Sequence, residues 1–471
     1  MLSIENRIDF SSISLFSNPF YIKGDIFGII ITFSPLLEQS ILSFKGEWIM
    51  FKELHQNIRV RIYTSFLSRL VGSMIFPFMA IYFTREMNST MAGILLTINV
   101  GAQFIASLYG GYLADQLGRK RMMVIGEWMK AFAFLGMIVA NSPLGIFPWP
   151  TYIMLTIIGI SSGLINPAAE AMLVDVSTKE TRAFMYSINY WAVNFSLMLG
   201  LIVGGFLYES HFFELLLILF AMSLITLWMT ISLIEETIKP LQGGNQKTSY
   251  GIKPIIQSYK TVIQDLPFVW FTLAGIAILS IEFQRNNFIS VRLAEEFIPQ
   301  TYSIFENLLI KVDGVRLLSL LTVENTILIV MLTTFVAKAI RNKSEQPIMY
   351  LGFILFGLGY AFLAFSNDIL GLFLAVIVLS VGELLYVPTR QAILAEIIDD
   401  SRRGAYMAFN GFVFQIGKMI GSIGIIVGDV VGGVGMGILT MILSLSGIFF
   451  AWISLSQVDR KKSITHAHKG M

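Results

Sequence analysis

The feature that most constrains this chain is a series of twelve apolar segments that begins shortly after residue 60. Each is roughly 20 residues long, which is enough to cross the hydrocarbon core of a bilayer as an α-helix. A helix is also the required form, because a backbone exposed to lipid has to satisfy its hydrogen bonds internally. The predicted spans are 62–83, 91–113, 122–140, 151–174, 183–207, 213–234, 267–289, 321–337, 348–365, 369–393, 405–427 and 434–455.

The charges between the spans test this count. Short loops rich in Lys and Arg stay on the cytoplasmic side of a membrane. With both termini placed inside, the cytoplasmic segments hold 21 Lys and Arg residues and the outer segments hold four. A missed or false span would place every later loop on the wrong side and abolish this asymmetry. The charge distribution therefore supports both the twelve spans and the two cytoplasmic termini.

Composition excludes several other classes of protein. The 471 residues are 55% hydrophobic and 14% charged, which is more apolar surface than a soluble protein of this size can bury. The chain contains no Cys, all four His residues lie outside the predicted spans, and no G-x-x-x-x-G-K-[ST] phosphate-binding loop occurs. We therefore expect no enzyme activity, no metal and no cofactor. The net charge of +2 does not indicate a nucleic-acid partner.

The first 49 residues differ from the rest of the chain. An apolar stretch at 26–44 is interrupted by a Pro and a Glu and has no later counterpart. Just before Met50, the residues Lys45-Gly46-Glu47 can be encoded by a bacterial ribosome-binding sequence. We expect Met50 to be the native start and residues 1–49 to be a translated upstream extension or disordered. A signal segment and a thirteenth helix are the alternatives.

The chain repeats itself at an offset of 221 residues, which relates segment 166–175 to segment 387–396. Six matches at one offset argue against coincidence and predict two six-helix halves. The matched pairs are Pro167 and Pro388, Ala171 and Ala392, Leu173 and Leu394, Asp175 and Glu396, Arg182 and Arg403, and Asn189 and Asn410.

The predicted organisation follows from the spans and the repeat. Residues 50–235 form the first six-helix bundle, 236–266 a cytoplasmic linker, 267–456 the second bundle and 457–471 a cytoplasmic tail. In the linker, 255–266 is expected to form a helix on the inner face of the membrane. In the long outer loop at 290–320, the spacing of Ile304, Leu308, Val312 and Leu317 predicts a surface-lying helix, with a packed cap as an equal alternative.

The loop after the second span has a specific order of residues, in which Gly111, Leu113, Asp115, Gly118, Arg119 and Lys120 fit the pattern G-x-L-a-D-x-x-G-R-K. This resembles the loop between helices 2 and 3 of the major facilitator superfamily. The resemblance covers about residues 50–455 and is to the twelve-helix multidrug:proton antiporter branch. It implies an all-α polytopic membrane protein in two pseudo-symmetric six-helix bundles, with the substrate path between them.

The resemblance also implies a role for this loop. In the family, the Asp caps helix 11, and the first Arg pairs with an acid at the inner end of helix 4 and so locks the outward-facing state. An acid at a helix N-terminus and a cation beside an acid are both favourable. The alternative is that the cations of the loop only anchor the topology. The predicted gating residues are Gly111, Asp115, Gly118, Arg119, Lys120 and Asp175.

Helices 1, 4, 7 and 10 line the central cavity under this resemblance, and most charges inside the spans fall on them. Glu282 and Glu383 lie nearest to mid-membrane. A carboxyl group in a cavity of low dielectric resists ionisation, so it can bind and release a proton near neutral pH. We expect these two acids to couple transport to protons. For Glu282, a static ion pair with Arg285 is an equal alternative. The other polar residues predicted to lie in the cavity are Arg69, Glu170, Gln284, Arg285, Arg390 and Lys418.

Some of these residues have other interpretations. Glu170 and Arg390 lie just past the two matched prolines, so gating or pairing between the halves is expected rather than contact with substrate. Glu127 and Lys130 are spaced i,i+3 on helix 3 and are expected to pair with each other. The aromatic residues that either line a substrate surface or only pack are Phe78, Tyr186, Tyr190, Trp191, Phe412 and Phe414.

The predicted function is proton-coupled efflux of amphipathic drug-like compounds by alternating access, carried out by a monomer in the bacterial plasma (inner) membrane. Its partners are a small-molecule substrate, protons and the lipid bilayer. Two features of the antiporter branch are absent, because Leu155 stands where an Arg often occurs and 200–205 lacks a Pro. A proton symporter that imports a nutrient is the first alternative, and a non-transporting receptor or enzyme on the same scaffold is the second.

Overall fold

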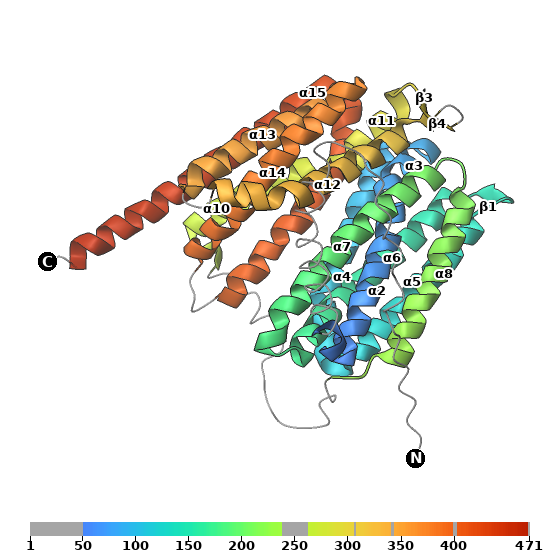
Figure 1. Cartoon of the computed structure of the whole chain (residues 1–471), viewed down its shortest axis with the longest axis horizontal. Helices are drawn as coiled ribbons and strands as arrows, with labels where there is room; N and C mark the ends of the chain where they lie inside the picture. Colours follow the sequence, from blue (N-terminus) through green and yellow to red (C-terminus); the bar gives the residue numbers. More distant parts are fainter. Residues whose placement is uncertain (1–49, 238–261, 306–307, 341–342, 399–402, 470–471) are drawn as a thin grey trace, which may run out of the picture. The chain divides into compact units, whose positions relative to one another are not determined.

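The computed structural model describes residues 50–237, 262–305, 308–340, 343–398 and 403–469. The chain divides into two compact units, Met1–Leu54 and His55–Met471. All labelled helices and strands belong to the second unit (Figure 1). The predicted upstream extension at 1–49 and most of the predicted linker, at 238–261, lie outside the described residues.

The first half begins with a broken helix. Helix α2 (Gln56–Ile75) is followed by a 3₁₀ turn, η2 (Phe76–Phe78), and by α3 (Met79–Glu86). The break falls at Pro77, which lacks an amide hydrogen and cannot continue the α-helical ladder. The half is completed by α4 (Ser89–Leu117), α5 (Arg119–Ala140), the short strands β1 (Asn141–Ser142) and β2 (Gly145–Ile146), α6 (Pro148–Val176), α7 (Lys179–Leu207) and α8 (Phe212–Leu233).

The second half also begins with a broken helix. Helix α10 (Leu266–Glu282) leads into a π-helical turn, η3 (Arg285–Ile289), and then into α11 (Ser290–Glu296). Two strands, β3 (Gln300–Phe305) and β4 (Leu308–Val312), follow. The remaining helices are α12 (Gly314–Ile340), α13 (Glu345–Phe365), α14 (Ile369–Ile397) and α15 (Arg403–Lys469).

Within the described residues, eleven helices are long and apolar enough to cross a membrane. The last of them, α15, contains two crossings, because Gly432 adopts a left-handed backbone conformation with φ of 68° and bends the helix. Glycine takes this conformation without steric cost. The structure therefore confirms the predicted all-α fold with twelve membrane crossings.

The internal repeat is visible in the helix boundaries. Adding 221 to Pro148–Val176 gives Ile369–Ile397, so α6 and α14 have identical length and register, each with a proline inside. Adding 210 to Gln56–Glu86 gives Leu266–Glu296, the two broken crossings that open the halves. Their breaks, η2 and η3, contact each other. Corresponding breaks in two halves are typical of a transporter's binding region.

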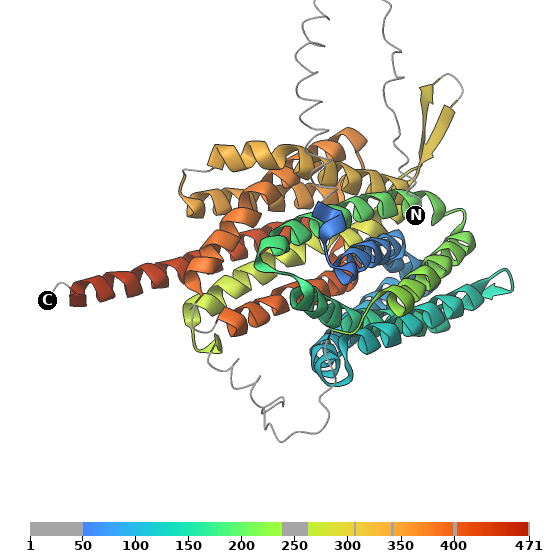
Figure 2. The same cartoon turned by 60° about the horizontal axis from the view of Figure 1, so that its bottom comes forward.

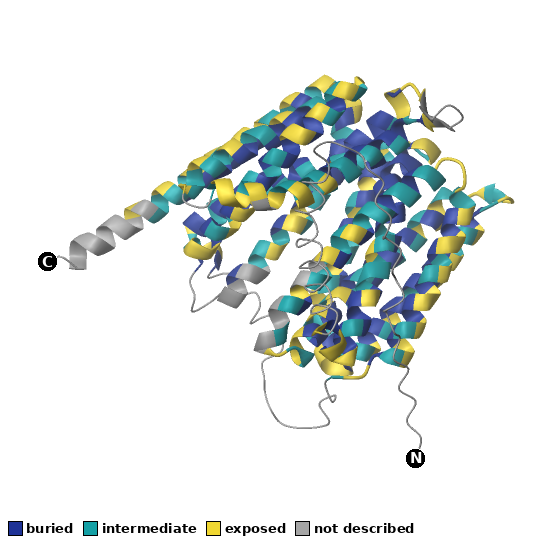
Figure 3. Ribbon diagram, viewed as in Figure 1, coloured by how far each residue is buried: buried dark blue, intermediate teal, exposed yellow. Residues whose placement is uncertain are grey.

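The helices carry exposed residues along their outer surfaces as well as buried ones (Figure 3), and many of the exposed residues are large and apolar. On α5, Trp128, Phe132 and Val139 are 57%, 62% and 66% exposed, whereas Phe134 and Met137 of the same helix are fully buried. A helix that is apolar all round is expected where its outer face contacts lipid rather than water. This pattern agrees with a membrane-spanning bundle.

The connection between α11 and α12 corrects one prediction. The expected surface helix through Ile304, Leu308 and Val312 is wrong, because β3 and β4 form an antiparallel hairpin there, with Gln300 paired to Val312. Threonine, tyrosine, isoleucine and valine, which favour strands, are concentrated in this stretch. The hairpin projects beyond the helices (Figure 2).

The two halves meet along α4 with α15 and along α7 with α12. We call the end of the bundle that carries Asp115 the motif end and the end that carries Arg85 the opposite end. At the opposite end, Arg85 Nη2 donates to the Ala294 carbonyl oxygen (3.4 Å), and Ser89 Oγ donates to Asp429 Oδ1 (3.2 Å). Both contacts join the first half to the second, so the halves are closed together at the opposite end.

Candidate functional site

Three helical elements of the second half bring polar side chains together inside the bundle. The turn η3 begins at Arg285, α12 carries Asn325, and α14 carries Ser380 and Glu383. Arg285 Nη1 donates to Asn325 Oδ1 (3.2 Å), and Asn325 Nδ2 donates to Ser380 Oγ (2.9 Å) and Glu383 Oε2 (3.2 Å). Asn325 is only 6% exposed. It links the arginine to the glutamate, and we call these residues together with Glu282 the Asn325 cluster.

Glu282 interacts with the other charged residues of the cluster electrostatically and not by direct contact. Among the described residues, no carboxylate oxygen lies within 4.0 Å of a nitrogen of Arg285, so the predicted Glu282–Arg285 contact pair is not formed. The physical reason is η3, since a π turn at Arg285 changes the spacing that places residues i and i+3 on one α-helical face. Glu282 still attracts Arg285 and repels Glu383 electrostatically.

The charge balance of the cluster suits it to exchange small cations. Two carboxylates and one guanidinium carry a net charge of −1 when both acids are ionised. A small pocket with room for about one water molecule lies beside Arg285 and Asn325; its other six lining residues are apolar, and neither acid lines it. Carboxylate, amide and hydroxyl oxygens are the ligands that hard cations prefer. The cluster can therefore hold a proton or a small cation as the balancing charge.

Gln284, the predicted polar neighbour of Glu282, faces a different part of the structure. It is 3% exposed and donates through Nε2 to the Ser280 carbonyl oxygen (3.4 Å). Its amide fills the space beside Gly424 of α15, where a Cβ atom would collide with it. Gln284 therefore packs between α10 and α15 rather than in the Asn325 cluster.

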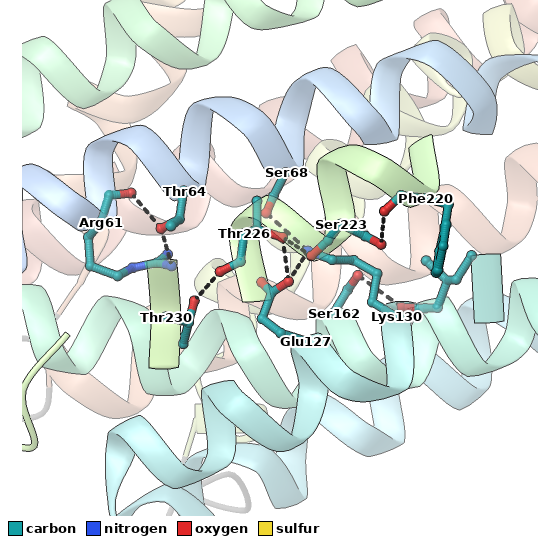
Figure 4. A network of polar contacts seen from close by, with 11 residues as sticks. Arg61, Thr64, Ser68, Glu127, Lys130, Ser162, Phe220, Ser223, Thr226 and Thr230 are labelled. Atoms are coloured by element: carbon teal, nitrogen blue, oxygen red, sulfur yellow. Dashed lines mark hydrogen bonds and ion pairs between the residues drawn. The ribbon is translucent and has the colours of Figure 1, made fainter. Parts of the chain in front are cut away.

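The first half contains a buried ion pair of its own (Figure 4). Lys130 Nζ lies 2.6 Å from Glu127 Oε2, which confirms the pairing predicted from their spacing on α5. Thr226 of α8 donates to the same oxygen (2.7 Å), and Lys130 Nζ also donates to Ser68 Oγ of α2 (3.3 Å). Glu127 and Lys130 are 1% and 5% exposed. The pair therefore ties three helices together.

Two of the predicted cavity cations lie at the interface between the halves. Lys418 of α15 donates through Nζ to Gln103 Oε1 of α4 (3.2 Å), and its Nζ lies 5.6 Å from the centre of the Phe414 ring. Arg69 of α2 has an exposed side chain and repels Lys418 as a like charge. The structure thus brings a cation from each half to the same region.

Glu170 and Arg390 lie apart from each other. Arg390 of α14 stacks over Phe271, with Cζ 5.7 Å from the ring centre, and donates through Nη2 to Asn410 Oδ1 (3.4 Å). Glu170 of α6 is exposed. Neither residue forms an ion pair with any described residue within 4.0 Å, so the gating role expected of them stays a prediction.

The predicted gating residues gather where α4 ends and α5 begins. Arg119 Nε lies 2.6 Å from Asp175 Oδ2 of α6, and Arg119 Nη2 lies 3.5 Å from Asp115 Oδ1. Gly118 has φ of 103°, a region that favours glycine. Lys120 Nζ donates to the Ile231 carbonyl oxygen of α8 (2.7 Å). The loop therefore joins α4, α5, α6 and α8 at the motif end. A Cβ atom on Gly111 would lie 3.7 Å from Pro167 Cβ, an ordinary van der Waals contact, so packing against α6 does not require this glycine.

Glu236, just beyond α8, completes this arrangement. Its Oε1 and Oε2 accept the backbone amides of Arg119 (2.9 Å) and Lys120 (3.0 Å), which caps the N-terminus of α5. Its carboxylate also fills the space beside Gly118 that a Cβ atom would need. The next residue, Thr237, donates to Asp175 Oδ2 (3.1 Å). The segment after α8 is therefore part of the structure around the loop between α4 and α5.

Sequence reasoning missed Asn325 and Glu236. Asn325 is uncharged, and a search for charged residues inside apolar spans passes over it, although a buried carboxamide in such a helix needs hydrogen-bond partners just as a charge does. Glu236 lies at the start of the linker, where an acid has no distinguishing pattern. A search for amides inside the spans would have found Asn325, whereas nothing in the sequence marks Glu236.

Twelve crossings in two related halves, with charged groups inside both, define a polytopic membrane transporter. The chain belongs to the Major Facilitator Superfamily, whose family model matches residues 62–291 and 301–470. Its relatives transport solutes across membranes, so the chain is a secondary transporter and not an enzyme.

The relatives and solved structures similar to the chain differ in what their names say they carry. A Na(+), Li(+), K(+)/H(+) antiporter of Planococcus maritimus is 30% identical over 412 residues, covering 85% of this chain and 96% of that protein. The multidrug resistance protein MdtH of Baumannia cicadellinicola is 25% identical over 368 residues, covering 74% and 78%. A crystal structure of a POT family transporter with 5-aminolevulinic acid shares the fold, with a TM-score of 0.65 at 15% identity, covering 86% of this chain and 98% of that one.

Proposed function

We propose that the chain is a proton-coupled antiporter of the bacterial plasma membrane that exports a monovalent cation in exchange for protons. The observation that carries this proposal is the bridge from Arg285 through Asn325 to Glu383, because it holds the Glu383 carboxylate beside a fixed positive charge inside the bundle. The name of the Planococcus maritimus relative supports an alkali cation as the exported ion.

Exchange follows from competition at one site. With Glu282 and Glu383 both ionised beside Arg285, the cluster has one uncompensated negative charge, which is costly inside a membrane. Either a proton or one alkali cation removes it. Both together would leave a net positive charge, so binding of the one favours release of the other. The change between the inward-facing and outward-facing states then carries whichever ion is bound.

The proposed orientation places the motif end in the cytoplasm. The excess of Lys and Arg at that end of the spans supports it. In this proposal, the closure of the halves at the opposite end belongs to the inward-facing state of an alternating-access cycle. In this proposal Arg119, Asp115 and Asp175 form one side of the gate that closes at the motif end in the outward-facing state.

A second candidate is efflux of amphipathic drug-like compounds. It is favoured by aromatic rings at the meeting of the halves, where Phe104 of α4 lies edge-on to Phe412 of α15, with ring centres 5.2 Å apart. The names of the MdtH relatives support the same substrate class. Aromatic faces bind apolar bodies and organic cations. The proton-coupling acids would be Glu282 and Glu383 in this case as well.

Inside-out membrane vesicles containing the protein test both candidates. With the interior acidified by respiration, addition of NaCl or KCl is expected to release protons from the lumen, as measured by the recovery of a quenched pH-sensitive dye. An amphipathic organic cation such as ethidium tests the second candidate in the same vesicles. A proton symporter would give no release in this arrangement, because its substrate and protons move in the same direction.

Variants connect the activity to the cluster. Glu383→Gln and Glu282→Gln are expected to abolish proton release, because neither amide can bind and release a proton. Glu214→Gln, a half-exposed acid in the first turn of α8, is the matched control and should exchange normally. Full exchange by both cluster variants would refute the proposal.

A further inference from the structure

Among the residues that the structure describes, two cations lie at the interface between the halves without an acid in contact. No carboxylate oxygen lies within 4.0 Å of Lys418 or Arg69 in the part of the chain that the structure describes. The single polar contact of the Lys418 ammonium there is the neutral Gln103 amide, at 3.2 Å. Arg69, which approaches from the other half, adds repulsion. Lys418 is partly buried and Arg69 is exposed, and two like charges that meet in a membrane bundle without an acid attract an anion.

Such an arrangement persists in a protein when it serves a ligand of opposite charge. An anion placed between Lys418 and Arg69 would remove the repulsion and supply the missing hydrogen-bond acceptors. The two cations come from α15 and α2, one from each half, so their ligand would contact both halves at once. That is the location expected of transported cargo.

The surroundings indicate what the rest of the ligand is like. Lys418 lies over the Phe414 ring, which is edge-on to Phe283 with centres 5.0 Å apart. Phe104 and Phe412 form a second edge-on pair across the interface. Ring faces and edges of this kind accept flat apolar groups. A bare inorganic anion would use the cations and leave the rings without a role.

We propose that Lys418 and Arg69 form a subsite for the acidic group of an amphipathic organic anion, whose apolar body lies against Phe104, Phe412 and Phe414. The acidic group is a carboxylate or a sulfonate. This subsite is separate from the Asn325 cluster and does not depend on the proposed cation–proton exchange.

Two fluorescent probes of nearly the same shape test the proposal on the full-length protein in lipid nanodiscs. 1-Anilinonaphthalene-8-sulfonate carries the acid, and N-phenyl-1-naphthylamine lacks it. Lys418→Gln and Arg69→Gln are each expected to weaken sulfonate binding by roughly tenfold or more, the effect of losing one charge-assisted hydrogen bond. Binding of the uncharged probe should stay unchanged, which also shows that the variants are folded.

Four further variants complete the test. Lys418→Arg and Arg69→Lys keep the charges and should largely keep sulfonate binding, whereas Lys343→Gln removes an exposed cation outside the interface and should have no effect. Glu383→Gln should bind the sulfonate normally, so failure of the proposed exchange leaves this inference intact. The subsite is refuted if both Gln variants bind the sulfonate like the unaltered protein, or if they lose affinity equally for both probes. It is also refuted if Lys343→Gln lowers sulfonate affinity as much as they do.

Discussion

Asn325 acts on both sides of the cluster because a carboxamide is an acceptor and a donor at once. Its oxygen accepts from Arg285, and its nitrogen donates to Ser380 and Glu383. The amide thereby fixes the guanidinium and the carboxylate relative to each other while leaving Glu383 able to bind a proton or a cation. Direct pairing with Arg285 would occupy the carboxylate and weaken its response to either ion.

Replacement of Asn325 by Leu tests this role. The variant keeps the branched shape of the side chain and removes three hydrogen bonds, so we expect a loss of about 1–3 kcal/mol in the stability of the site and a large fall in exchange rate. Dye recovery in inside-out vesicles measures the rate. Thr326→Val, on the next position of α12, removes a hydroxyl that bonds only to the backbone of its own helix and should exchange normally. Unaltered exchange by the Leu variant would contradict the role given to Asn325.

Gly118 allows a second residue-level prediction. Gly118→Ala places a Cβ on a backbone with φ of 103° and against the Glu236 carboxylate. The left-handed conformation alone costs about 1–2 kcal/mol for a non-glycine residue, so the purified variant should lose its folded state at a lower temperature. Glu236→Ala in the same background relieves the collision but not the backbone strain. The fall in unfolding temperature of the double variant should therefore be smaller than the sum of the falls in the two single variants. Strict additivity would show that the two residues do not interact.

Charged residues inside the spans could be predicted one by one, because such residues are rare in apolar helices. Their partners could not. Arg285 meets Asn325 across 40 positions of sequence, and Asn325 meets Glu383 across 58. No local spacing connects residues so far apart, whereas Glu127 and Lys130, three positions apart on one helix, were paired correctly.

At the scale of elements, the breaks in the first crossing of each half matter most. The turn η3 begins at Arg285 and sets its direction, and η2 lies in contact with η3. Length and apolarity predicted all twelve crossings. They could not predict the breaks, since η3 contains no proline, nor the bend at Gly432, where one continuous helix contains two crossings. The β3–β4 hairpin was missed because its apolar residues fit a helical spacing as well as a strand.

The Glu127–Lys130 pair gives a prediction at this scale, because it joins α5 to α2 and α8. Lys130→Met leaves the Glu127 carboxylate buried without its cation, which is expected to cost about 3–5 kcal/mol. The melting temperature of the purified protein, followed as loss of the folded peak on size exclusion, should fall by several degrees. The double variant Glu127→Leu with Lys130→Met removes both charges and should recover most of the loss. Equal melting of the single variant and the unaltered protein would show that the pair contributes no stability.

For the whole molecule, closure at the opposite end depends on close approach of helices from the two halves. Gly93 of α4 packs against the Ile426 side chain of α15, and Gly205 of α7 packs against Ser319 of α12. Small residues at such crossings let helices approach closely in a membrane, where apolar attraction between helices is weak. Ser89 and Asp429 add a hydrogen bond beside the first of these contacts. In the proposed cycle all of them have to separate before the opposite end can open.

Cross-linking tests this movement. The chain has no cysteine, so Ser89→Cys with Asp429→Cys creates a unique reactive pair. A short reducible bis-thiol reagent should join the two residues readily and stop cation–proton exchange, and a reductant should restore it. Each single-cysteine variant treated in the same way is the control. Exchange at the full rate by fully cross-linked protein would show that these contacts stay closed during transport.

The helix boundaries also show where the two halves differ in length. The opening crossings of the two halves are related by 210 positions, whereas α6 and α14 are related by 221. The second half therefore gained a net eleven residues between these points. The hairpin β3–β4 lies in that interval, between α11 and α12, while α3 and α4 are joined by only Met87 and Asn88. An ancestral gene encoding six helices, with the first helix interrupted and the fourth containing its proline, accounts for the features that both halves share, and the hairpin is a feature in which they differ.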